Sequence, residues 1–391
     1  MSSDYEQDKE TFFMDHLFNV IKMNHKIIGW PDIEKSDVKA TYLKALSNMT
    51  YRVDCKLPGV NPILAKRFGQ GFLDRLLDRS IDNMVSEVLG NIGVGPKVLY
   101  YSHRCRVEEF LLCSEFTKED MVNPKMRLLL TYEIQKLHRA EIPGLPKGSL
   151  FQRSLDDNIH IFKLFKESVA QKKDSFTEEE SKKVEFVSKL IDPQEIAWLT
   201  AKLKPYDNEL VVSHNDFLNG NILKLPNGEL KLIDFEYCTY NFRAYDIANF
   251  VSESLFDYTK PDAPYFYYYP EKRDTDEQIR DMIKYYTLFS AFPKNPPYQT
   301  AKYLVDHPEE ADRELEILFG SQKAWQDKVD MYISQLSVGY LLSHFWWILW
   351  AIMMCKNPHV QFDYIEFAYQ RTLDYFHIKE KVIAKEAPQN K

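Results

Sequence analysis

The sequence predicts an α+β fold in which a small β-rich lobe, residues 1–117, precedes a larger and mainly helical lobe, residues 118–391. Strand-like runs follow one another as far as about Phe116, and helical periodicity dominates from Arg127 onward. A single β element, residues 211–237, interrupts the helical part. A chain of 391 residues is long enough for two such lobes with a large core.

The first lobe is predicted from runs of alternating apolar residues bounded by glycine and proline. TYRVDCKL (50–57) and PILAKRF (62–68) have the pattern of two strands joined by a short turn. Residues 72–93 have helical periodicity and end in glycine, a common signal of a helix terminus. After them, VLYYS and RVEEFLLCSEF predict two more strands.

Helical patterns predict the second lobe, among them residues 126–140 and 176–191. Between later helices, PDAPYFYYYPEKRD (261–274) has three prolines and four tyrosines, which predicts a loop. Residues 334–355 hold no Asp, Glu, Lys or Arg, and a bilayer span takes about 20 apolar residues. Serine, glutamine, glycine and histidine dilute that run, and no basic cluster flanks it. We therefore expect an inward-facing helix and no membrane span.

The composition is that of an ordinary globular protein, and it excludes several classes. The chain has 50 basic against 58 acidic residues, a net charge of −8, so no nucleic-acid partner is expected. Its five cysteines are scattered without a CxxC pair, which indicates neither a disulfide framework nor a zinc site. The N-terminus is polar and acidic, unlike a targeting leader, so a cytoplasmic location is expected.

The interrupting element is VVSHNDFLNGNILKLPNGELKLIDFEY. Asn227-Gly228 between two apolar-alternating runs is a strong signal of a β-hairpin. A two-residue turn there puts position 225 opposite 230, and continuing the same register puts Asn221 opposite Asp234. Opposed side chains on one face of a hairpin lie about 5 Å apart.

Asp216 precedes Asn221 by five residues, in the loop that leads into the hairpin, so that two carboxylates and a carboxamide are expected at one edge. These are hard oxygen ligands that suit Mg²⁺. Protein kinases place a catalytic Asp five residues before a metal-binding Asn, with a second metal-binding Asp at a nearby strand end, and Asp234 completes that spacing. The alternative is a surface hairpin whose polar side chains only cap turns.

HNDFLNGNIL, followed by LIDFEYCTYNFRAYDIANFVSE, resembles the signature of the choline and ethanolamine kinases. The resemblance runs from about Leu43 to Phe376, with Asn241, Asp246 and Glu253 at the spacing of the family. It implies the bilobal protein-kinase-like fold that the family shares with aminoglycoside phosphotransferases, with ATP as the phosphate donor.

By the same resemblance, Asp216 is the base that takes the proton from the substrate hydroxyl. Asn221 and Asp234 are implied as Mg²⁺ ligands, and Glu236 as a residue that supports the metal through water. Dimers are common in this family, so the resemblance allows a homodimer.

The nucleotide site is less clearly marked. No P-loop motif is present, and GNIGVG (90–95) follows a helix, which favours helix termination. Related kinases use a turn between the first two strands, often two glycines before LSN. In LKALSNMTY, Ser47, Asn48 and Met49 match that turn, but Lys44 and Ala45 stand at the glycine positions.

A basic residue on the next strand is expected to reach the phosphates, and the resemblance puts Lys66 there. Arg67 is the neighbouring alternative, on the opposite face of the strand. The acidic partner of this lysine on the following helix falls at Asp82, with Glu87 as a competitor. A lysine that only extends its ammonium to solvent remains the simpler alternative.

Choline carries a quaternary ammonium with no N–H donor, so a site for it must use aromatic faces and nearby carboxylates. By resemblance, Glu253 lies near that end of the substrate and Tyr258 lines the pocket. The helix reading SHFWWILW matches a family pattern in which Trp347 and Trp350, three residues apart on one helix face, form two walls. Phe367 falls where the family usually has Tyr.

Trp346 lies outside that match, and core packing is expected for it. The aromatic residues that follow Glu253 resemble the choline branch, which favours an ATP-dependent choline kinase. Three alternatives stay open. The first is a kinase for ethanolamine, for both choline and ethanolamine, or more remotely for another amino alcohol or an aminoglycoside. The second is a catalytically silent kinase-like binding module, and the third is a membrane-anchored protein.

Overall fold

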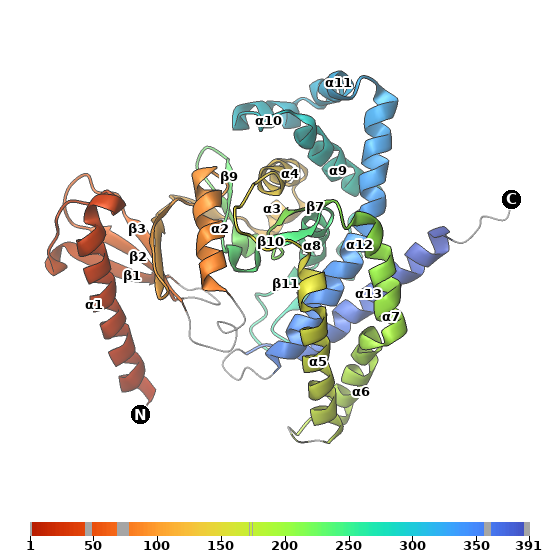
Figure 1. The fold of residues 1–391 in the computed structure, drawn as a ribbon, viewed down its shortest axis with the longest axis horizontal. Coiled ribbons are helices and arrows are strands. Elements are labelled where there is room, and N and C mark those ends of the chain that lie inside the picture. Colours follow the sequence, from red (N-terminus) through yellow and green to blue (C-terminus); the bar gives the residue numbers. More distant parts are fainter. Residues whose placement is uncertain are drawn as a thin grey trace. The chain divides into compact units, whose positions relative to one another are not determined.

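The computed structural model describes residues 2–43, 49–68, 78–171, 173, 175–355 and 361–386, with side chains from residue 14 onward (Figure 1). The chain divides into two compact units. The first unit comprises Met1–Ser114 and Leu223–Tyr237, and the second comprises Glu115–Ile222 and Cys238–Lys391. The β element predicted inside the helical lobe is thus grouped with the N-terminal sheet for most of its length.

The first unit contains a five-stranded antiparallel sheet of order β1-β2-β3-β5-β4. Its strands are β1 (Val38–Leu43), β2 (Met49–Cys55), β3 (Ile63–Arg67), β4 (Val98–Tyr101) and β5 (Cys105–Glu109). The predicted strands of this lobe therefore form with ends shifted by a few residues, except that RVEEFLLCSEF divides into β5 and a separate short strand, β6 (Ser114–Glu115). The helix α2 (Arg79–Asn91) begins at an Asp78 cap whose carboxylate accepts two backbone N–H groups, and it ends where glycine predicted its end.

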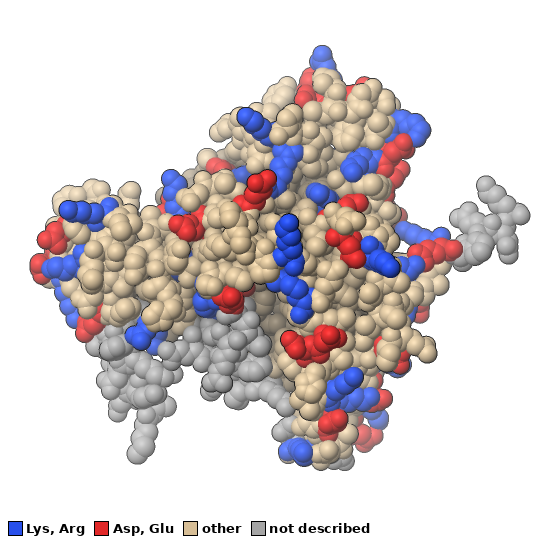
Figure 2. Space-filling model, in the orientation of Figure 1, with Lys and Arg blue, Asp and Glu red and all other residues tan. Residues whose placement is uncertain are grey.

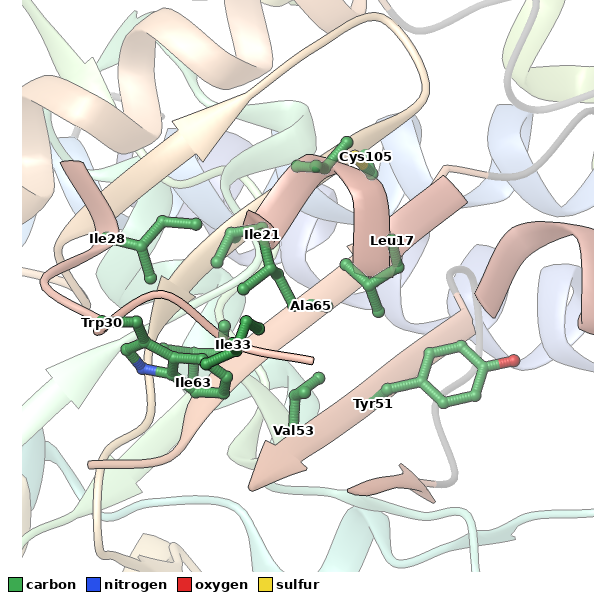
Figure 3. Packing of buried hydrophobic residues seen from close by; sticks show 12 residues of the cluster. Leu17, Ile21, Ile28, Trp30, Ile33, Tyr51, Val53, Ile63, Ala65 and Cys105 are labelled. Atoms are coloured by element: carbon green, nitrogen blue, oxygen red, sulfur yellow. The ribbon is translucent and has the colours of Figure 1, made fainter. Parts of the chain in front are cut away.

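A long N-terminal helix, α1 (Ser2–Ile28), was not predicted. Figure 3 shows Leu17 and Ile21 of this helix beside strand residues such as Val53 and Ala65, with Trp30 close by. These side chains form one buried cluster. Within residues 14–28 of this helix, whose side chains are described, Leu17, Val20, Ile21 and Ile28 are buried.

The hairpin consists of β8 (Ile222–Lys224) and β9 (Leu230–Leu232), and the predicted register is wrong by one residue. The N–H of Gly228 donates to the carbonyl of Leu225 (2.8 Å), and the N–H of Leu225 donates to the carbonyl of Glu229 (2.8 Å). Leu225 therefore faces Glu229, not 230. The loop has three residues and ends in Gly228 at φ +85°, the geometry of a hairpin with a glycine bulge. With this shift, the hairpin register does not place Asn221 opposite Asp234.

The hairpin continues into contacts with the loop after α2. The N–H of Leu232 donates to the carbonyl of Val94 (2.9 Å), and Lys231 Nζ donates to the carbonyl of Gly93 (2.6 Å). A Cβ at Gly95 would lie 2.8 Å from the ring of Phe235, so only glycine fits there. GNIGVG thus ends a helix and lets the hairpin approach.

The second unit is mainly helical, as predicted. Its α-helices are α3 (Lys118–Val122), α4 (Pro124–His138), α5 (Leu150–Ala170), α6 (Glu178–Val187), α7 (Pro193–Leu203), α8 (Tyr245–Glu253), α9 (Asp276–Ala291), α10 (Tyr298–Asp306), α11 (Pro308–Phe319), α12 (Gln322–Met354) and α13 (Tyr364–Glu386). Two short pairs of strands join them: β7 (Leu210–Ser213) with β10 (Thr239–Phe242), and β11 (Phe256–Asp257) with β12 (Tyr267–Tyr268). The predicted loop 261–274 thus contains β12.

Helix α12 holds the uncharged run. By length and composition it could cross a membrane, but 78% of its most apolar window is buried. It packs against α5, α8, α9 and α13, which run beside it (Figure 1). A helix that is buried on all sides is expected to be apolar all round. The uncharged run is therefore that of a core helix in a globular unit.

Basic and acidic side chains are interspersed on the face that Figure 2 presents, and neither sign dominates a large area there. This agrees with a net charge of only −8 on 391 residues. The view shows no broad basic surface of the kind that binds a phosphate backbone.

Candidate active site

Asp216 and Asn221 lie together in the loop between β7 and β8. The amide Nδ2 of Asn221 donates to the backbone carbonyl and to Oδ2 of Asp216, both at 2.9 Å. Asn221 is buried, whereas Asp216 is partly exposed. Because its N–H groups are directed at Asp216, Asn221 presents its carbonyl oxygen elsewhere, as a metal ligand would.

The backbone before Asp216 is held by the buried carboxylate of Asp246 on α8. The N–H groups of His214 (2.8 Å) and Asn215 (3.0 Å) both donate to it. Asn215 has a φ of +68°, a left-handed conformation that costs free energy and needs such support. Nε2 of His138 lies 3.1 Å from the same carboxylate, which ties the loop to α4 as well.

A second set of amides fixes the loop beyond Asp216. The N–H of Phe217 donates to Oδ1 of Asn249 (2.7 Å), and Nδ2 of Asn249 donates to Ser343 of α12 (3.1 Å). Nδ2 of Asn241 donates to Oδ1 of Asn215 (2.7 Å). None of these supporting residues was predicted as a site residue, although Asn241 and Asp246 were noted for keeping the spacing of the family signature.

Acidification below about pH 6.5 is expected to destabilise the second unit through two buried histidines. Burial lowers the pKa of His138, although Asp246 opposes the shift. Burial also lowers the pKa of His344, well below its usual range, and repulsion from Arg371 and Arg273 adds to the shift. Such a histidine binds more protons when the chain is unfolded, so the free energy of unfolding falls as pH drops through about 6.5.

Each such histidine can remove at most about 1.4 kcal/mol per pH unit. Urea unfolding at about pH 7.5 and about pH 5.5 measures the loss. The variant His344→Gln should lose less stability between these two conditions than the wild type. An equal loss in both proteins would contradict the prediction.

In the first unit, Lys66 of β3 is buried, and its ammonium lies 3.9 Å from both Glu108 of β5 and Asp234. The expected acidic partner, Asp82, has other neighbours: Arg106 at 2.8 Å and Arg79 at 3.2 Å. The strand lysine is therefore flanked by a strand glutamate and by Asp234, and Asp82 affects it only at longer range.

Arg106 organises this network from β5, where it is almost completely buried. It donates to Glu108 (2.7 Å) and to Asp82 (2.8 Å). Burial alone would raise the pKa of Asp82, but the charge and hydrogen bond of Arg106 outweigh it and hold that pKa below its usual range. Arg106 was not predicted as a site residue. In the sequence, the only sign of its role is the alternation of charged and apolar residues in RVEEF.

Asp234 and Glu236 follow β9. Asp234 has a φ of +65°, an uncommon conformation for a residue other than glycine. Burial, and then the nearby Asp234, raise the pKa of Glu236 to about 7, although Arg79 at 3.1 Å opposes the shift. Two carboxylates that crowd one another in this way are suited to a divalent cation, which would relieve their repulsion.

Among the residues that the structure describes, no group of three His, Cys, Asp or Glu side chains has metal-site geometry. Of the predicted nucleotide-binding turn, Ser47 and Asn48 lie outside the described residues. Met49 opens β2, and its sulfur lies 3.8 Å from Nη1 of Arg67. The competitor Glu87 interacts with Tyr101, whose pKa it raises.

Glu253, at the end of α8, is buried and uses both carboxylate oxygens within the protein. Oε1 pairs with the fully buried Arg371 of α13, and Oε2 accepts the hydroxyl of Tyr258 at 2.7 Å. Tyr258 is 37% exposed, but its hydroxyl points inward to this carboxylate. Burial of the hydroxyl, and then Glu253, raise its pKa well above the usual range.

The predicted aromatic residues of the second unit form one connected cluster with rings that were not predicted. Trp347 and Trp350 meet edge to face with centroids 5.1 Å apart, and Trp350 contacts Tyr364 at 5.8 Å. The cluster continues through Phe362 to Tyr258 and Phe367 at ring distances of 4.9, 6.1 and 5.5 Å. Trp350 is partly exposed, whereas Trp346 is buried in the core, as expected.

Comparison with known proteins gives a consistent result. The family model "Choline/ethanolamine kinase" matches residues 41–376. Mouse ethanolamine kinase 1 is 25% identical over 325 residues, which cover 80% of this chain and 76% of that protein. Human choline/ethanolamine kinase is 24% identical over 364 residues, 90% of this chain and 82% of that protein.

The crystal structure of choline kinase from Cryptosporidium parvum superposes with a TM-score of 0.67 at 22% identity, covering 95% of this chain and 96% of that chain. This likeness confirms the predicted protein-kinase-like fold class. Since the family model spans most of the sequence, the chain belongs to the choline/ethanolamine kinase family, phosphotransferases with an alcohol as acceptor.

Proposed function

We propose that this protein is an ATP-dependent choline kinase, which transfers the γ-phosphate of ATP to the choline hydroxyl and yields phosphocholine and ADP. The observation that carries the proposal is the connected ring cluster, from Trp347 and Trp350 to Tyr258, with Glu253 at its edge. A quaternary ammonium cannot donate a hydrogen bond, so aromatic faces are the groups best suited to hold it. The reaction begins phosphatidylcholine synthesis, in the cytosol.

Asp216 is the proposed base. It accepts the proton of the choline hydroxyl as the oxygen attacks the γ-phosphorus. Asn221 keeps Asp216 oriented through one hydrogen bond to its carboxylate and one to its backbone carbonyl, and Asp246 holds the preceding backbone. This arrangement supplies the positioning on which phosphoryl transfer depends.

On the nucleotide side, Lys66 is proposed to bind the phosphates, with Asp82 and Glu108 maintaining the charge balance around it. Ser47, Asn48 and Met49 are proposed to form the phosphate turn, as the sequence implies. Asn221, Asp234 and Glu236 are the proposed Mg²⁺ ligands, because one carboxamide and two carboxylates supply the oxygen atoms that Mg²⁺ prefers. When bound, Mg²⁺ neutralises phosphate charge.

Ethanolamine kinase is the second candidate, favoured by the relative named ethanolamine kinase 1. Its primary ammonium needs hydrogen-bond acceptors. In this structure, both oxygens of Glu253 already have internal partners, which supports choline.

The test is ADP release from Mg-ATP with choline or ethanolamine at matched concentrations. A higher kcat/KM for choline is expected. Preference for ethanolamine would replace the first proposal with the second, and turnover of neither would favour a silent binding module.

Replacing Trp350 with alanine should raise the KM for choline about fivefold to thirtyfold, since a cation–π wall is worth about 1–2 kcal/mol. The KM for ATP should change little. Trp198 on α7 is also partly exposed and lies outside the ring cluster, with Lys379 4.6 Å from its ring centroid, so Trp198→Ala is the matched control. Steady-state kinetics with choline and with ATP as the varied substrate measure the two KM values. Equal rises in the two KM values would mean that Trp350 is only a packing residue.

A further inference from the structure

We propose that Lys118 is a specificity-determining residue that weakens binding of the cationic acceptor by placing a fixed positive charge beside Tyr258. The inference rests on the proposed function, in which Tyr258 lines the acceptor site. It adds a residue that neither the family signature nor the motif spacing singled out.

Lys118 opens α3, and its side chain is partly buried against the end of α8. Its ammonium donates to the backbone carbonyl of Glu253 at 3.1 Å and lies 5.8 Å from the ring centroid of Tyr258. Carbonyls at a helix C-terminus attract cations, so the ammonium is held in place at the end of α8. The same lysine therefore contacts both residues that the proposed function puts at the acceptor ammonium.

The carboxylate of Glu253 is not available as a full counter-charge to this ammonium. Glu253 is already neutralised by the fully buried Arg371, and the hydroxyl of Tyr258 takes its other oxygen. Asp257 is the remaining acidic group that acts on Lys118. Burial nevertheless lowers the pKa of Lys118, against the opposing effect of both carboxylates, which indicates a poorly solvated ammonium.

Two consequences follow for an acceptor that presents a cation to Tyr258. The ammonium of Lys118 repels the acceptor cation. The same ammonium also interacts with the negative π-system of Tyr258, which weakens the attraction of that ring for the acceptor cation. A neutral acceptor of the same shape escapes both effects. The lysine should therefore raise the KM of a charged acceptor selectively.

The test compares Lys118→Met, which keeps the length of the side chain without the charge, with Lys118→Arg, which keeps the charge. Each variant and the wild type are assayed for ADP release with choline and with 3,3-dimethylbutan-1-ol, the uncharged isostere of choline. In Lys118→Met, the KM for choline should fall roughly threefold to tenfold, while the KM for the neutral alcohol stays at its wild-type value. Lys118→Arg should retain the wild-type KM for choline.

A purely structural role would have a different outcome. If Lys118 only caps α8, Lys118→Met should loosen Tyr258 and raise the KM of both acceptors together. That result, or an unchanged KM for choline, would overturn the inference while leaving the proposed function intact. A wild-type protein that phosphorylates neither amino alcohol would instead overturn the proposed function itself.

Discussion

Replacing Asp216 with asparagine is expected to lower kcat about a thousandfold, because the general base is lost while the shape of the side chain is kept. Asn221 can still donate to the remaining carbonyl oxygen at position 216, so the loop should keep its conformation. The measurement is kcat from ADP release at saturating Mg-ATP and acceptor, together with the midpoint of thermal unfolding. The midpoint should change by no more than a few degrees.

Asp327→Asn is the matched control for this variant. Asp327 is an exposed residue of α12 that pairs with Lys323 one turn away, at 2.6 Å. Such a pair contributes about 0.3–0.5 kcal/mol, so neither kcat nor stability should change appreciably. Near-normal turnover by Asp216→Asn would remove Asp216 from the role of base.

Replacing Asp246 with alanine is expected to have the largest effect on stability, about 3–5 kcal/mol, because it removes a buried carboxylate from several partners. The N–H groups of His214 and Asn215 and the ring of His138 would all lose their acceptor. The strained backbone before Asp216 would also lose its support, so kcat should fall about a hundredfold. Urea unfolding and turnover at low temperature measure the two effects separately.

Asp274→Ala provides the comparison. Asp274 forms a buried ion pair with Arg127, and none of its observed partners belongs to the loop that holds Asp216. Its removal should cost a similar free energy of unfolding but leave the kcat of the folded fraction unchanged. If both variants lost activity in proportion to their stability alone, Asp246 would have no separate role in positioning the loop.

Local patterns account for what could be predicted. The strands around Tyr51 and Val107 alternate between apolar and polar residues, a pattern that predicts a sheet strand. The caps and periodicity of α4 and α6 locate those helices in the same way. The family signature singled out Asp216, Asn221 and Asp234 as candidate site residues, because the spacing of chemical groups is itself a sequence property.

What could not be predicted depends on contacts between distant residues. The hairpin register followed from a bulge at Gly228, which a glycine-containing turn permits but does not require. The pairing of Arg106 with Asp82 joins β5 to α2, and that of Glu253 with Arg371 joins α8 to α13. No spacing along the chain encodes such pairs, since they depend on how the elements pack.

The sequence by itself thus determined the fold class, the family, the loop from Asp216 to Asn221 and a tryptophan pair on one face of a helix. Only the tertiary structure decided which charges are already neutralised. It paired Arg371 with Glu253, placed Lys118 beside the ring of Tyr258, and surrounded Lys66 with Glu108 and Asp234. The physical reason is that electrostatic energies depend on distance and burial in three dimensions, and neither quantity is a local property of the chain.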